Sequence, residues 1–178
     1  MNGSNDLLLT AVPGIPLVDS ECDIVDLVLA ALSAQNLTLK TGDILVIAQK
    51  IVSKAEGRMV NLAEVEPGDQ AQELARKTSK DPRLVELILS ESSEVLRAID
   101  ELIIVAHRLG IVLANAGIDA SNVAPSTADE QVLLLPKDPD RSAREYCRRI
   151  KQQTGSSVGI IINDSVGRAW RLGTTSLA

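Results

Sequence analysis

The chain has 178 residues and a formal net charge of −6, with one tryptophan, one tyrosine and no phenylalanine. An acidic chain is unsuited to nonspecific nucleic-acid binding, which needs an excess of lysine and arginine. No apolar run approaches the roughly 20 residues of a membrane span, and the first residues lack the basic flank and apolar core of a secretory signal. We therefore expect a cytoplasmic protein of one or two domains with an aliphatic core, and neither nucleic acid nor membrane as a partner.

The first half of the chain predicts alternating strands and helices. A strand over residues 7–12 is broken by the prolines and glycine of residues 13–16. Helical spacing of apolar residues predicts a helix over 23–34, capped by Asp19 or Ser20. A buried strand over 44–48 follows, and then helices over 69–77 and 82–90, the second with proline in its first turn.

Strands and hairpins dominate the predicted second half. Strands are expected over 94–99, 102–106 and 111–114, with a tight turn at 108–110 joining the last two as a hairpin. A strand over 131–135 and a helix over 141–153, capped by Asp138 or Asp140, lead to a final β-branched strand that begins at Val158. Because hairpins interrupt the alternation, we expect an α+β fold with a mixed, largely antiparallel sheet and flanking helices.

Two lysines directly follow the strand over 44–48. Lys50 and Lys54 stand four residues apart, so a helical segment would place both on one face, where they could meet one anionic group. Lysine is a compact point charge that suits phosphate. A solvated basic turn beside Glu56 is the alternative. The chain has no Walker A motif, so a phosphate site would have to be built in another way.

Hard oxygen ligands follow a second apolar run. Asp119 and Asn122 lie in a stretch of residues that tolerate unusual backbone angles. Their oxygens suit Mg²⁺ or Mn²⁺. A turn that satisfies its own backbone is the alternative interpretation.

The end of the final strand carries the densest set of polar groups. Asp164 and Ser165 could serve one or two metal ions, and Arg168 and Arg171 could grip a phosphate or carboxylate with two hydrogen bonds each. The alternative is a strand end followed by a charged surface loop. Elsewhere, the turn over 13–16 could offer backbone N–H groups to a base or sugar, although a plain structural turn is the simpler interpretation. His107, the only histidine, has no partner at catalytic spacing, which favours a structural or solvent-facing role.

Taken together and in this order, these segments resemble the coenzyme F-420-0:L-glutamate ligase family. The resemblance covers nearly the whole chain and rests on residues 14–16, 48–58, 80–89, 114–123, 133–140 and 163–171. It implies the F-420 gamma-glutamyl ligase-like fold and a GTP-dependent ligase that adds L-glutamate to coenzyme F-420-0 and extends its γ-linked tail through an acyl phosphate. It also implies a homodimer that uses Mg²⁺ or Mn²⁺, with K⁺ as a further candidate ion.

The resemblance carries roles over to individual positions. The residues that it implies for contact with GTP are Gly14, Ile15, Pro16, Leu17, Gln49, Lys50, Lys54 and Asn122. The residues that it implies for metal binding are Asp119, Asp164 and Ser165, the last at a position that is usually threonine. Lys54 is also a candidate catalytic residue. Arg168 and Arg171 are our own additions to that catalytic set, as binders of substrate phosphate or carboxylate.

One departure from the family concerns length. Family members continue well past residue 171 with another nucleotide-contacting loop and another acidic metal ligand. Residues 1–178 are therefore expected to be the N-terminal and central portion of such a ligase domain, with the C-terminal part absent and activity weakened or absent in these residues alone. Two alternatives stay open: a related ligase that glutamylates folate, and a nucleotide-binding module that has lost catalysis.

Overall fold

A computed structural model describes residues 7–119, 131–164, 166–167 and 174–175. The helices in this part of the chain are α1 (Ile24–Ala34), α2 (Gln49–Ala55), α3 (Asp69–Thr78), α4 (Pro82–Ser90) and α5 (Pro139–Thr154), with short 3₁₀ helices η1 (Leu62–Glu64) and η2 (Asn115–Gly117). The strands are β1 (Ile44–Ala48), β2 (Met59–Asn61), β3 (Ser92–Ile99), β4 (Leu102–His107), β5 (Val112–Ala114), β6 (Gln131–Leu133), β7 (Gly159–Asn163), β8 (Val166–Gly167) and β9 (Thr174–Thr175). Within these residues no helix combines the length and apolar character needed to cross a bilayer.

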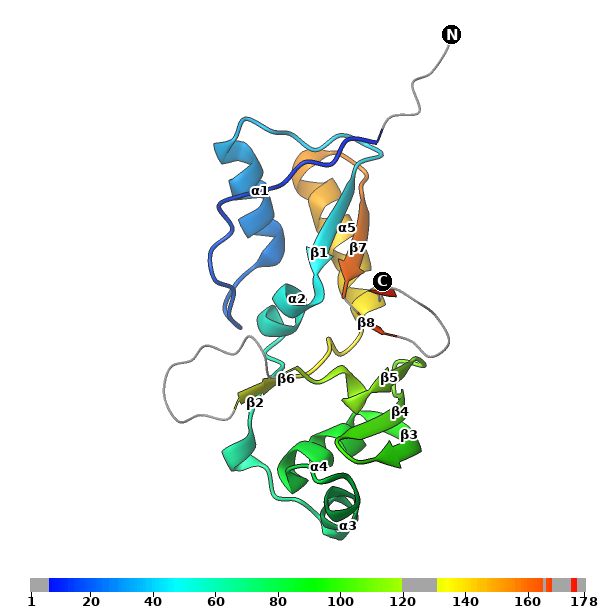
Figure 1. The fold of residues 1–178 in the computed structure, drawn as a ribbon. Coiled ribbons are helices and arrows are strands. Elements are labelled where there is room, and N and C mark those ends of the chain that lie inside the picture. The colour runs from blue at the N-terminus through cyan, green and yellow to red at the C-terminus, as the bar shows by residue number, and fades with distance from the viewer. Residues whose placement is uncertain (1–6, 120–130, 165, 168–173, 176–178) are drawn as a thin grey trace.

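The elements gather into two halves with separate aliphatic cores (Figure 1). In the first, here called the β1–β7 half, the two strands pair in parallel beside α1, α2 and α5, around buried residues that include Ile47, Val52 and Ile162. In the second, the β3–β5 half, an antiparallel three-stranded sheet packs against α3 and α4 around Ile88 and Val105. The antiparallel pair β2–β6 lies between the halves.

The expected α+β class is confirmed, with a different distribution of strands. The described strands form four small sheets, β1–β7, β2–β6, β3–β4–β5 and β8–β9, instead of one, and only β1–β7 is parallel. The buried apolar residues form separate clusters in the two halves, and each half packs its clusters against a sheet of its own.

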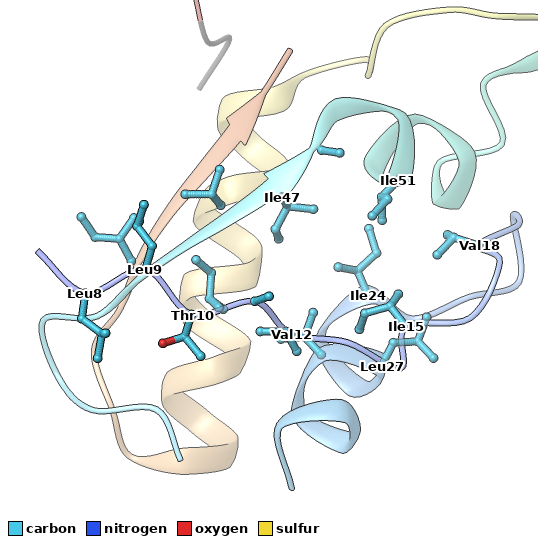
Figure 2. A pocket seen from close by; sticks show the side chains of 16 residues that line it. Leu8, Leu9, Thr10, Val12, Ile15, Val18, Ile24, Leu27, Ile47 and Ile51 are labelled. Atoms are coloured by element: carbon cyan, nitrogen blue, oxygen red, sulfur yellow. The ribbon is translucent and has the colours of Figure 1, made fainter. Parts of the chain in front are cut away.

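Two local predictions from sequence were wrong. Residues 7–12 form no strand, because they have no ladder partner; they run as an irregular segment along α1 and β1, with Leu8 and Leu9 more than 80% exposed at 87% and 83% (Figure 2). The cap of α1 is Asp23, which lies next to the helix and whose Oδ1 accepts the N–H of Asp26 at 3.1 Å. An aspartate directly before the first helical residue satisfies an orphan donor that the earlier candidates cannot reach.

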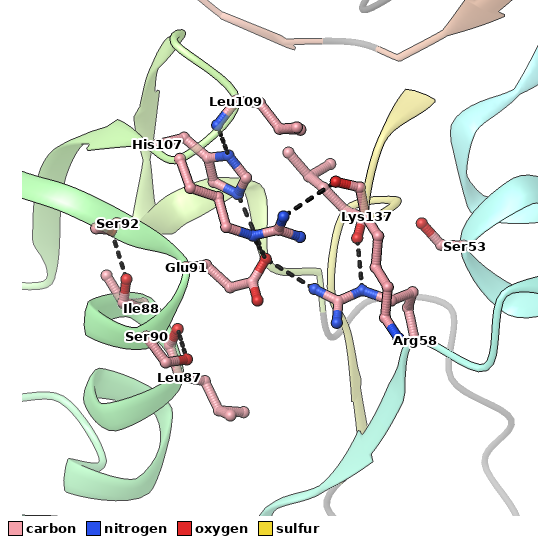
Figure 3. Close-up of polar contacts among 12 residues, drawn as sticks. Ser53, Arg58, Leu87, Ile88, Ser90, Glu91, Ser92, His107, Leu109 and Lys137 are labelled. Atoms are coloured by element: carbon pink, nitrogen blue, oxygen red, sulfur yellow. Dashed lines mark hydrogen bonds and ion pairs between the residues drawn. The ribbon is translucent and has the colours of Figure 1, made fainter. Parts of the chain in front are cut away.

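One buried carboxylate links the β3–β5 half to the chain after α2 (Figure 3). Glu91 caps the end of α4 and is 7% exposed. Its Oε2 forms an ion pair with Nη2 of Arg58 at 2.7 Å and accepts a hydrogen bond from Nε of Arg108 at 2.9 Å. Nε2 of His107 lies 3.6 Å from the same oxygen, beyond hydrogen-bond length. Because Nδ1 of His107 accepts the N–H of Leu109 at 3.0 Å, the neutral ring carries its proton on Nε2, facing the carboxylate.

The polar groups around Glu91 keep it ionised. Burial alone would raise the pKa of this carboxyl, but His107, Arg58 and Arg108 outweigh that effect and lower the pKa to about 2. His107, which the sequence left between structural and solvent-facing roles, is therefore a buried structural residue.

A left-handed turn places the residues that follow β5. Asn115, Ala116 and Gly117 have φ values of 49°, 54° and 67°, so three successive residues adopt the left-handed region. A β-carbon on Gly117 would lie 3.0 Å from Cδ1 of Leu135, so glycine allows close approach of the chain there. The turn sets the position of Asp119, two residues later.

The ionised Glu91 predicts an acid-dependent loss of stability. A carboxyl with a lowered folded-state pKa stabilises the fold above its unfolded pKa near 4.5, and this contribution disappears as the pH falls toward about 2. At roughly 1.4 kcal/mol per pKa unit, the charged group contributes on the order of 3 kcal/mol at neutral pH. Urea unfolding of wild type and Glu91→Gln from pH 7 to pH 3 should show a gap in unfolding free energy that narrows below pH 4.5. A gap that stays constant to pH 3 would contradict the role of the charge.

A second prediction concerns Gly117. In Gly117→Ala the new methyl group meets Leu135, whereas Gly110→Ala, at φ 79°, meets nothing within 4 Å. Both variants carry the left-handed strain of about 1 kcal/mol, and only the first adds crowding. Thermal unfolding should show Gly117→Ala as the less stable by about 1 kcal/mol or more. Equal melting temperatures would show that Leu135 yields without cost.

Candidate functional site

The paired ends of β1 and β7 bring two polar segments together. Ala48, the last residue of β1, pairs with Asn163, the last residue of β7. Carboxyl ends of parallel strands open on the same edge of a sheet. Gln49, which begins α2, and Asp164 therefore leave the sheet at the same edge, as the polar end of the final strand suggested.

The helix α2 has one buried face and one cationic face. Residues 49–55 are helical, so Lys50 and Lys54 lie one turn apart on the same side, as the sequence predicted for a helical segment. On the other side Gln49 and Ser53 are buried at 4% and 0% exposure, and Nε2 of Gln49 donates a hydrogen bond to Oγ of Ser53 at 2.5 Å. Gln49, an expected nucleotide contact, thus has a buried side chain that forms a hydrogen bond within α2.

The decisive contact joins two segments far apart in sequence. The ammonium group of Lys50 forms an ion pair with Oδ2 of Asp119, and both side chains are about one-third exposed, at 32% and 28%. The backbone of Asp119 is held by Leu133: the N–H of Asp119 donates to the carbonyl of Leu133 at 3.0 Å, and the carbonyl of Asp119 accepts the N–H of Leu133 at 2.8 Å. Asp119 is therefore an anchored carboxylate at a cationic helix.

Two of the three expected metal ligands, Asp119 and Asp164, lie within the described residues. Asp119 contacts Lys50 in α2, and Asp164 directly follows Asn163, which pairs with Ala48 just before α2. In the described part of the chain no group of three or more His, Cys, Asp or Glu side chains is placed to hold a metal ion. Carboxylate oxygens are nevertheless suitable ligands for Mg²⁺ or Mn²⁺. The carboxylate of Asp119 is already paired with a positive charge, the ammonium group of Lys50. We call Lys50, Lys54, Asp119 and Asp164 the lysine–aspartate site.

The expected GTP-contacting residues 14–17 lie by an apolar pocket (Figure 2). A cavity of about 640 Å³ is lined by Ile15 from this segment, by the neighbouring Val18, by residues of α1 and β1, and by Ile51 in the first turn of α2. Gly14 adopts a φ of 89°, and Leu17 is 93% exposed. The pocket and the lysine–aspartate site thus share the β1–α2 junction, while the pocket wall itself carries no charged residue.

Four expected site residues are not described by the structure, and one carboxylate has contacts that the sequence did not predict. Asn122, Ser165, Arg168 and Arg171 lie outside the described residues. Glu56, treated from sequence only as a neighbour of the lysines, accepts the N–H of Lys137 at 2.9 Å and the hydroxyl of Ser142 at 2.6 Å. It therefore ties the end of α2 to the start of α5, and its only sequence signal was a carboxylate next to the turn at Gly57.

Comparison with known proteins identifies the family of the chain. The model of the family described as F420-0:Gamma-glutamyl ligase matches residues 14–178. The chain is 45% identical over 170 residues to the Coenzyme F420:L-glutamate ligase of Methanothermobacter thermautotrophicus, covering 96% of this chain and 66% of that protein. It is 47% identical over 150 residues to the protein of that name from Methanopyrus kandleri, with 84% and 58% covered, and 40% identical over 167 residues to that of Archaeoglobus fulgidus, with 94% and 63% covered.

The matches therefore cover most of this chain but a smaller share of each relative. The chain spans roughly six-tenths of the length of these curated relatives. A family match over nearly all of the chain, together with identities of 40–47% over most of it, establishes that the chain belongs to the F420-0:gamma-glutamyl ligase family.

Proposed function

We propose that this chain takes part in the GTP-dependent addition of L-glutamate to coenzyme F-420-0 and in the extension of its γ-linked tail. The names of its relatives support the ligase reaction and the acceptor. The observation that carries the proposal is the ion pair of Lys50 with Asp119 at the edge where Asp164 emerges. Lysines beside anchored carboxylates are the charges that a metal-bound nucleotide phosphate requires.

The reaction needs an activated acceptor. A carboxylate does not condense with an amine in water, so the γ-phosphoryl group of GTP is transferred to the acceptor carboxylate, giving an acyl phosphate and GDP. The amine of L-glutamate attacks the acyl carbon, inorganic phosphate leaves with the bonding electron pair, and the nitrogen loses a proton to give the amide. Positioning and charge neutralisation, which bring the reacting groups together and stabilise the transferred phosphoryl group, are the main tasks of the protein.

Each residue of the site has a place in this scheme. Lys50 and Lys54 bind phosphate oxygens, with Lys50 exchanging its contact to Asp119 for one to the nucleotide. Asp119 and Asp164 hold the divalent ion, with Mg²⁺ or Mn²⁺ supplying neutralisation of the phosphate charge when bound. Residues 14–17 offer backbone groups to the base or sugar from across the β1–α2 junction.

The remaining parts of the proposal concern groups beyond this set. Ser165 is proposed as a third metal ligand and Asn122 as a further GTP contact. Arg168 and Arg171 are proposed to bind substrate phosphate or carboxylate. A homodimer in the cytoplasm, with K⁺ as an additional ion, completes the proposal.

A reconstitution assay tests the proposed reaction. The chain is mixed with GTP, Mn²⁺, L-glutamate and F-420-0, alone and together with the separately produced portion of the Methanothermobacter thermautotrophicus ligase that it does not match. Mass spectrometry should detect γ-glutamylated product and GDP in at least the second mixture. A parallel reaction with folate in place of F-420-0 should give none. Product from folate alone would reassign the acceptor, and no product in any mixture would contradict the ligase proposal.

Asp164→Asn tests the metal role separately. Loss of one carboxylate charge from a two-aspartate ion site should abolish Mn²⁺ binding measured by calorimetry in the presence of GTP. Asp100→Asn, at an exposed turn between β3 and β4, is the matched control and should bind as wild type does. Unchanged Mn²⁺ affinity in Asp164→Asn would remove Asp164 from the site.

A further inference from the structure

A chain of contacts begins at the ion pair of Glu91 with Arg58, which Figure 3 shows, and continues to the lysine–aspartate site. Arg58 is its first step. Nη2 of Arg58 pairs with Glu91, its Nε donates to the carbonyl of Leu135 at 2.8 Å, and its own carbonyl accepts the N–H of Leu134 at 3.1 Å. One residue therefore binds the buried carboxylate and fixes two consecutive residues just after β6.

The second step runs from β6 to Asp119. Leu133, adjacent to Leu134, exchanges two backbone hydrogen bonds with Asp119, and the carboxylate of Asp119 pairs with Lys50. Because Arg58 follows the end of α2 by only three residues, these contacts close a loop that begins and ends at α2. The position of Asp119 relative to Lys50 is thus fixed through Arg58 as well as by their direct contact.

We propose that Glu91 is a positioning residue for the nucleotide site, holding Arg58 so that the segment after β6 presents Asp119 to Lys50. This inference rests on the proposed function, because it assigns Glu91 a part in binding the metal–nucleotide complex without touching it. Nothing in the ligase chemistry itself calls for a carboxylate at this position.

The charge of Glu91 is what the arrangement needs. The side chain of Arg58 is 12% exposed and that of Glu91 10%, so Glu91 is a largely buried counter-ion for the largely buried guanidinium of Arg58. Removing the carboxylate charge leaves a buried guanidinium without its counter-ion, a situation that proteins tolerate poorly. Arg58 then moves toward water and releases the carbonyl of Leu135, which loosens the strand segment that carries Asp119.

A second branch from Glu91 reinforces the first. Arg108, which donates to Glu91, also donates from Nη1 to the carbonyl of Lys137 at 3.0 Å, and the N–H of Lys137 is bound by Glu56. Two arginines that bind the carboxylate of Glu91 therefore also hold the segment between β6 and α5, one at each end. The geometry of the site depends on a residue in the other half of the molecule.

Hydrogen exchange and ligand binding test the inference together in Glu91→Gln, which keeps the shape and removes the charge. Relative to the amides of Val105 and Leu113, paired between β4 and β5, those of Asp119 and Leu133 should exchange about tenfold faster in Glu91→Gln than in wild type. The affinity for Mn²⁺ with GTP should fall about tenfold, the scale seen when residues that orient metal ligands are replaced. Glu94→Gln, at an exposed position of β3, is the matched control and should leave both measurements unchanged.

The outcomes separate this inference from the proposed function. Faster exchange spread evenly over Val105, Leu113, Asp119 and Leu133 would mean that Glu91 only stabilises the fold, and unchanged exchange at Asp119 would also overturn the inference. If wild type itself binds no GTP, the proposed function fails while the exchange data still decide whether Glu91 positions Asp119. A tenfold change in exchange with unaltered ligand affinity would overturn the assigned role in binding.

A second variant, Arg58→Lys, tests the inference independently in case Glu91→Gln does not fold. Arg58→Lys keeps a cation beside Glu91 but lacks the planar fork that bonds Glu91 and Leu135 at once. It should accelerate exchange at Asp119 and weaken Mn²⁺–GTP binding in the same direction as Glu91→Gln. Wild-type behaviour of Arg58→Lys in both measurements would contradict the relay through Arg58.

Discussion

The ion pair of Lys50 with Asp119 is the contact on which the account of the site depends. It joins the first turn of α2 to a residue almost 70 positions later in the chain, which is held by the backbone of Leu133. A lone, partly exposed ion pair contributes little to stability. Its importance is positional, because it assembles a cation and a carboxylate at the edge where β7 delivers Asp164.

The division of the molecule explains why this contact needs support. The β1–β7 half supplies the lysines and Asp164, whereas Asp119 follows the last strand of the β3–β5 half. Separate cores do not by themselves fix the orientation of two halves. Arg58 and Glu91, with the short β2–β6 ladder, supply that constraint through buried polar contacts instead of apolar packing.

Sequence patterns predicted the elements that local chemistry determines. The apolar run of β1, the proline in the first turn of α4 and the spacing of Lys50 and Lys54 each indicated elements that the fold contains. The expected burial of β1 was wrong in part, because Ile44 and Val46 on one face of the strand are both 61% exposed. The strand predicted over 7–12 is absent because an apolar run indicates a preference for burial but does not specify a strand to pair with. The Glu91 network left no local signal, since its members come from three separate turns and are defined only by packing. Family resemblance, in contrast, implies one metal site for Asp119 and Asp164, a prediction that neither spacing nor periodicity makes.

The most direct test of the central claim is the location of a bound ion. A crystal of the chain grown with Mn²⁺ and GTP, measured at a wavelength where manganese scatters anomalously, would reveal the ion independently of any assumed ligand. We predict an anomalous peak within about 2.0–2.3 Å of carboxylate oxygens from both Asp119 and Asp164, with Lys50 turned to a phosphate oxygen. A peak bound by neither aspartate, with Lys50 still paired to Asp119, would contradict it.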